Sequence, residues 1–146
     1  MSSWTDKRPM SPHVSIWKWH MTMASSILHR VTGCAIYVGA FLIVAWLFAA
    51  AAGPDMYEPM AGLIGSIWGQ LVLFGFTLAM SYHLLNGVRH LFMDAGKGFN
   101  PKFASFTAGL ALVLSVVLAV SVWLLAGLVP GVDPLSIANT LLGAAQ

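Results

Sequence analysis

The segment CAIYVGAFLIVAWLFAAAA, residues 34–52, contains no charged residue, and the segment before it, SILHRVTG (residues 26–33), places a histidine and an arginine at its start. An α-helix needs about 20 predominantly apolar residues to cross the hydrocarbon core of a bilayer. Two further uncharged stretches, residues 59–88 and 103–132, are also long enough. The sequence therefore predicts three transmembrane helices.

The composition of the chain supports this interpretation. Only 8% of the 146 residues are charged and 58% are hydrophobic, whereas about 25% of the residues of a soluble domain are charged. A spanning β-barrel would alternate apolar and polar residues, and no such alternation occurs. We therefore predict an all-α fold, an integral membrane bundle of three helices near 27–52, 64–92 and 104–129, within a membrane domain that covers 22–132.

The segments outside and between these helices are predicted from their turn residues. Pro9 and Pro12 favour an extended or short-helical N-terminal arm over 1–21, and 133–146 is predicted to be a tail. The stretches GPDMYEP (residues 53–59) and DAGKGFNPK (94–102) are typical of loops. The near-common face of Gly62, Gly65 and Gly69 predicts close helix packing.

The basic residues lie on one side of this topology. All seven Lys and Arg residues lie before or at the start of the first helix, or near the loop between the second and third helices. The positive-inside rule makes that side cytoplasmic and the tail periplasmic. The first residues resemble neither a signal peptide nor a transit peptide, so we expect a bacterial inner membrane. The basic residues form no compact patch, and we expect no binding to nucleic acid.

His83 lies in the second predicted helix, in LAMSYHLLNGVRH, before Arg89. The helical rise places it roughly 9 Å inside the basic boundary. Ionisable residues at such a depth are costly and need partners. The residues alone leave three roles open for His83: a hydrogen bond to a neighbouring helix, a proton relay, or ligation of haem iron.

His90 lies on the same helix face as His83, roughly 10.5 Å away. Two axial ligands approach a haem iron from opposite sides of the ring, so these two histidines cannot hold one iron. The other histidines, His13, His20 and His29, lie near the basic boundary. A six-coordinate haem at His83 would therefore need a second ligand from another subunit.

Ser26 and Arg30 share a helix face at the start of the first span, and His29 lies on its flank. One interpretation is a polar helix end with a snorkelling arginine. The other is a site for a polar head group or an anion, such as a quinone ring or haem propionates. Arg89 and His90 reach the same depth on the second helix and could share that role, while Asp94 is expected to pair with Arg89.

The blocks RPMSPHVSIW, SILHRVTG and YHLLNGVRHLFMD appear in this order along the chain. Together they resemble the cytochrome b subunit of succinate dehydrogenase, the larger membrane anchor of respiratory complex II. The resemblance covers essentially the whole chain. It implies a non-catalytic subunit of an oxidoreductase that passes electrons from succinate to ubiquinone in the tricarboxylic acid cycle and the respiratory chain.

The resemblance also implies roles for single residues. His83 matches the axial ligand of a non-covalent haem b, whose opposite ligand would come from a second, smaller membrane anchor. Ser26 and Arg30 match positions of the ubiquinone pocket. His29 and Arg30 match the region of the haem propionates, and Arg89 and His90 are further candidates there.

Succinate oxidation would take place in a flavoprotein subunit and an iron–sulfur subunit. The chain has no dinucleotide-binding fingerprint, and its single cysteine, Cys34, cannot bind a cluster. Three other hypotheses remain open. They are a haem-free structural anchor, a transport component that uses His83, His90 and Asp94 as a proton relay, and the same subunit in a fumarate reductase.

Overall fold

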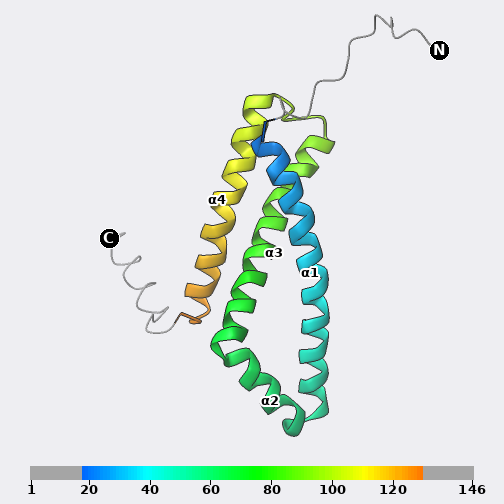
Figure 1. Cartoon of the computed structure of the whole chain (residues 1–146), viewed down its shortest axis with the longest axis vertical. Helices are drawn as coiled ribbons and strands as arrows, with labels where there is room; N and C mark the ends of the chain where they lie inside the picture. Colours follow the sequence, from blue (N-terminus) through cyan, green and yellow to red (C-terminus); the bar gives the residue numbers. More distant parts are fainter. Residues whose placement is uncertain (1–17, 130–146) are drawn as a thin grey trace, which may run out of the picture.

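The computed structural model describes residues 18–129, which form four α-helices and no strand. The helices are α1 (Met21–Ala52), α2 (Pro54–Gly65), α3 (Ile67–Asp94) and α4 (Pro101–Leu125). Three of them, α1, α3 and α4, are long and apolar enough to cross a membrane. The predicted all-α bundle with three spans is confirmed (Figure 1).

The predicted N-terminal arm lies outside the described residues except for residues 18–21, and the predicted tail over 133–146 lies outside them entirely. Residues 18–20 have no regular structure, and α1 begins directly after them at Met21. The arm and the tail therefore stay predictions.

The predicted loop at residues 53–59 is wrong, because most of it belongs to α2. Pro54 takes the first position of this helix, where its missing N–H costs nothing. Asp55 lies in the first turn, where a negative charge is favourable. Gly53 and Pro54 therefore mark a helix boundary here, whereas Pro59 lies inside α2.

A break at Ser66 separates α2 from α3, so the second span begins at Ile67 rather than near residue 64. The Ser66 side chain caps α3 by accepting a hydrogen bond from the Gly69 amide, at 3.2 Å. An added Cβ at Gly62 or Gly65 would meet nothing within 4 Å. The close packing predicted for these two glycines is not found among the described residues.

The third span packs through small side chains. α4 is capped by Asn100, whose side chain accepts from the amides of Lys102 and Phe103. Its buried residues recur every three or four positions: Ala104, Ala108, Ala111, Ser115 and Ala119. Small residues allow helix backbones to approach closely in a membrane bundle, and this seam faces the other two spans.

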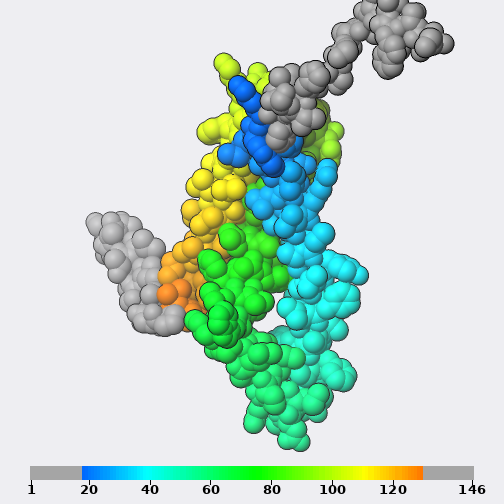
Figure 2. All heavy atoms as spheres, viewed as in Figure 1, coloured from blue at the N-terminus to red at the C-terminus, as the bar shows by residue number. Residues whose placement is uncertain are grey.

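The two ends of the bundle differ. The start of α1 and the loop between α3 and α4 lie at one end, with α2 at the other (Figure 1). The described basic residues all belong to the first of these, which we call the basic end: Lys18, Arg30, Arg89, Lys97 and Lys102. At the α2 end, Figure 2 shows an opening between α1 and the chain that leads into α3.

Candidate functional site

His83 faces α1, and one ring nitrogen makes its hydrogen bonds. Nδ1 lies 3.2 Å from the carbonyl oxygen of His29 and 3.3 Å from Oγ1 of Thr32. A carbonyl oxygen accepts but never donates, so Nδ1 carries the proton and donates to it. The other nitrogen, Nε2, then holds the lone pair of a neutral imidazole, which is the form that binds metals.

Gly33 makes room for this ring. A Cβ added at Gly33 would lie 3.2 Å from Cε1 of His83, closer than an ordinary contact. Thr32, Gly33 and the His29 carbonyl thus form the wall against which the imidazole rests. This explains in physical terms why the segment HRVTG and His83 belong to one site.

His29 stacks on His83. The two ring centroids are 3.9 Å apart and the planes differ by 11°, while His90 lies 5.0 Å from His29 with its ring tilted by 50°. Two nearly parallel rings do not direct their nitrogens at one point. Within residues 18–129 no group of three or more His, Cys, Asp or Glu side chains is placed to hold a bare metal ion.

A buried polar cluster that the sequence did not reveal lies next to the histidines. Ser25 donates to Oδ1 of Asn86 at 2.9 Å, and Tyr82 donates to the Ser25 carbonyl oxygen at 3.0 Å. All three side chains are buried, and Asn86 has no exposed surface. Tyr82 and Asn86 are spaced i,i+4, and this spacing of two polar residues on one helix face is the signal that could have revealed the cluster.

Ser26 belongs to a different environment from Ser25. It lines a cavity of about 410 Å³ at the basic end, together with Arg89 and His90. His20 and Ser105 also contribute to its wall. The structure therefore brings Ser26 close to the end of α3, as a shared site would require. Arg30 is exposed and is not among the residues that line this cavity.

Arg89 is held by α4. Its Nε donates to Oγ1 of Thr107 at 3.1 Å, and one terminal nitrogen donates to the Ala104 carbonyl oxygen at 3.2 Å. The expected pairing with Asp94 does not form within the described part of the chain. The guanidinium instead lies between the cavity of Ser26 and a second, more apolar groove.

The chain is similar in sequence to known membrane proteins. Residues 5–127 match the family model described as succinate dehydrogenase/fumarate reductase transmembrane subunit. The chain is 39% identical over 113 residues to the succinate dehydrogenase cytochrome b556 subunit of Paracoccus denitrificans, covering 77% of this chain and 87% of that protein. The b556 subunit of Rickettsia bellii is 39% identical over 118 residues, with 81% and 92% covered.

A mitochondrial protein is also similar. The succinate dehydrogenase cytochrome b560 subunit of Sus scrofa is 35% identical over 118 residues, covering 77% of this chain and 68% of that protein. The region that matches the family model contains all three spans, the histidines of α1 and α3 and the cavity of Ser26.

Proposed function

The chain belongs to the succinate dehydrogenase/fumarate reductase transmembrane subunit family, and we propose that it binds haem b and forms part of a ubiquinone-reduction site. It is a multi-pass membrane subunit of succinate dehydrogenase. In the proposed complex, a smaller membrane anchor completes the haem site, and the iron–sulfur subunit delivers electrons that the flavoprotein subunit takes from succinate.

The observation that carries the haem proposal is the hydrogen bond from His83 Nδ1 to the His29 carbonyl oxygen. Histidines that bind metals commonly donate their second N–H to a carbonyl, which fixes the tautomer and the ring orientation. The polar partner also offsets part of the cost of an imidazole at membrane depth. The residues therefore fit an axial ligand that presents Nε2 to iron.

When bound at His83, haem b would supply an iron centre capable of one-electron redox chemistry. His29 cannot provide the opposite ligand, because its ring is stacked on the ring of His83 rather than across from it. This supports a second ligand from the smaller membrane anchor. His29, Arg30, Arg89 and His90 are the candidates for the propionate region, and among them the rings of His29 and His90 lie in contact.

The quinone proposal places a carbonyl oxygen of the ring near the Ser26 hydroxyl, in the cavity at the basic end. Arg30 lies one helical turn further along the same face of α1 and adds positive potential, which stabilises negative charge as the ring is reduced. Quinone reduction also consumes protons. Proton access is favourable there if the basic end faces the cytoplasm of a bacterial inner membrane, as the positive-inside rule predicts.

Replacing His83 with Ala tests haem ligation. We expect the purified complex to lose its b-type optical spectrum and its bound haem, since even loss of a supporting hydrogen bond costs roughly 10- to 100-fold in metal affinity. Leu84→Ala is the matched control, because this neighbour on the same helix is exposed and lies about 100° around the helix from His83. An unchanged spectrum and unchanged haem content in the His83 variant would refute ligation by His83. A pyridine haemochrome assay that finds no haem in the unmutated complex would instead leave a haem-free anchor.

Replacing Ser26 with Ala tests the quinone site. Loss of one hydrogen bond should lower quinone reductase activity about 2- to 10-fold, while succinate oxidation with an artificial soluble acceptor stays nearly intact. Ser25→Ala is the comparison, because Ser25 is buried away from the cavity and its loss should lower stability rather than quinone reduction. Unchanged quinone reductase activity in the Ser26 variant would contradict a role in quinone binding, whereas an equal loss of both activities would indicate failed assembly.

A further inference from the structure

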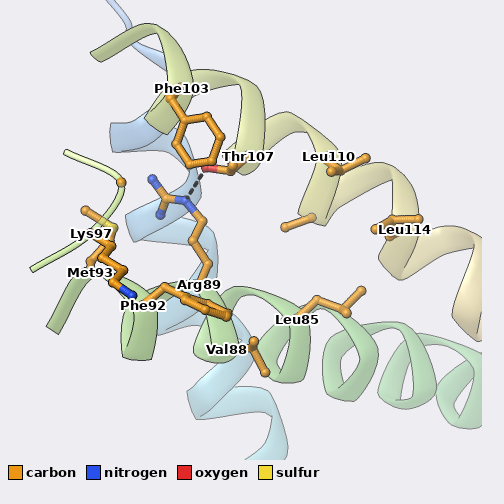
Figure 3. A pocket seen from close by; sticks show the side chains of 12 residues that line it. Leu85, Val88, Arg89, Phe92, Met93, Lys97, Phe103, Thr107, Leu110 and Leu114 are labelled. Carbon is orange, nitrogen blue, oxygen red and sulfur yellow. Dashed lines mark hydrogen bonds between the residues drawn. The ribbon is translucent and has the colours of Figure 1, made fainter. Parts of the chain in front are cut away.

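An apolar groove runs between α3 and α4 at the basic end (Figure 3). Its volume is about 460 Å³. Leu85 and Val88 form the α3 wall, and Leu110 and Leu114 form the α4 wall. The lining runs from Leu85 to Met93 on α3 and from Phe103 to Leu114 on α4, so each wall extends over at least two helical turns, or more than about 10 Å. The groove is therefore long and narrow, and its walls are hydrocarbon.

Two cations lie at one end of this groove. Arg89 and Lys97 both belong to its lining, and Figure 3 shows them at the end opposite Leu114. Arg89 is fixed there by its hydrogen bonds to Thr107 and Ala104. These bonds use Nε and one terminal nitrogen, so the guanidinium, with its five N–H donors, retains others for an additional acceptor.

The groove lies on a different side of α3 from the histidines. His83 and His90 share one face of the helix, whereas Val88 and Phe92 lie on nearly the opposite face at 3.6 residues per turn. Leu110, on α4, is 42% exposed although it is large and apolar. The groove is thus separate from the proposed haem and quinone sites, apart from Arg89 and Met93, which line both the groove and the cavity of Ser26.

We propose that this groove binds an anionic phospholipid, with its phosphate at Lys97 and Arg89 and an acyl chain between α3 and α4. The positive charge and the shape of the groove favour a phospholipid over a neutral helix or a quinone tail. Neither of these would interact with the two cations at the end of the groove. Basic pockets between transmembrane helices on the cytoplasmic side are suited to anionic head groups. The basic end would place the site in that leaflet.

The test is native mass spectrometry of the complex purified in detergent, titrated with phosphatidylglycerol or with phosphatidylcholine of the same acyl chains. We expect phosphatidylglycerol to bind more tightly. Lys97→Gln should weaken its binding roughly fivefold, the effect of losing one basic charge near the lipid surface. Lys102→Gln is the matched control, because Lys102 lies at the start of α4, also at the basic end, but does not line the groove.

A second pair of variants tests the acyl chain. Leu110→Trp should fill the groove and abolish the preference for phosphatidylglycerol. Leu112→Trp should not, since Leu112 is equally exposed, at 41%, on another face of α4. The proposal would be overturned if the two lipids bound equally well, or if the Lys97 and Lys102 variants had equal effects. A structure of the complex with a protein helix in the groove would also overturn it.

Discussion

The contact between α1 and α3 is polar near the basic end and apolar further along the helices toward α2. Near the basic end, buried Ser25 and Thr32 reach side chains of α3 through hydrogen bonds. Further toward α2, buried Gly39 lies directly under the ring of Phe76. Hydrogen bonds fix direction and register, whereas an apolar contact fixes mainly distance. The candidate site lies at the end where register is fixed.

This contrast gives each end its own expected response to mutation. Substitutions at the α2 end should change stability and leave the site chemistry alone. Substitutions at the basic end should separate into those that loosen the helix pair and those that alter the site.

Gly39→Ala should have the largest effect on stability. An added Cβ would overlap the ring of Phe76, and overpacking of this kind costs roughly 1–3 kcal/mol. Gly75→Ala is the control, because an added Cβ there meets nothing within 4 Å. Both variants gain the same helix propensity of about 1 kcal/mol. Unfolding in detergent measures the difference, and equal stabilities would mean that the helices do not approach closely at this point.

Ser25→Ala should destabilise the helix pair more than Ser26→Ala. It removes the donor to Asn86, which is fully buried and whose Nδ2 has no partner within the described residues. A side-chain hydrogen bond between transmembrane helices contributes roughly 0.6–1.7 kcal/mol. The same unfolding assay applies. A Ser26 variant that is the less stable of the two would reverse the roles assigned to these neighbouring serines.

Thr32→Val and Thr77→Val should show the smallest and most selective effects. Thr77 accepts a hydrogen bond from Nε1 of Trp123 at 3.2 Å, so its loss should lower stability by about 0.6 kcal/mol without changing the haem spectrum. Thr32→Val should retain haem, because the His29 carbonyl still accepts from His83, but should shift its absorption. A spectral shift in the Thr77 variant and none in the Thr32 variant would contradict the division between the two ends.

The three spans could be predicted because each is a long uncharged stretch, a property that the bilayer alone imposes. α2 could not, since Gly53, Pro54 and Pro59 suggest turns, and the break at Ser66 lies inside an uninterrupted apolar run. The N-cap of α3, in which the Ser66 side chain accepts a hydrogen bond from the Gly69 amide, depends on local geometry that hydropathy does not reveal.

The candidate site could also be predicted only in part from the sequence. His29, His83 and His90 could be named from the sequence because ionisable residues are rare in a membrane span. Their stacking could not, because it depends on how α1 and α3 are rotated against each other. Ser25 could not be told from Ser26, since adjacent serines look alike in a sequence. Only the packing shows that one is buried against Asn86 and the other lines a cavity.

The most direct test of the central claim is an electron cryomicroscopy map of the assembled complex at a resolution that orients the His83 ring. We predict a porphyrin iron at bonding distance from Nε2, with Nδ1 still donating to the His29 carbonyl oxygen. A ring bonded to iron through Nδ1, or no porphyrin beside His83, would contradict the account.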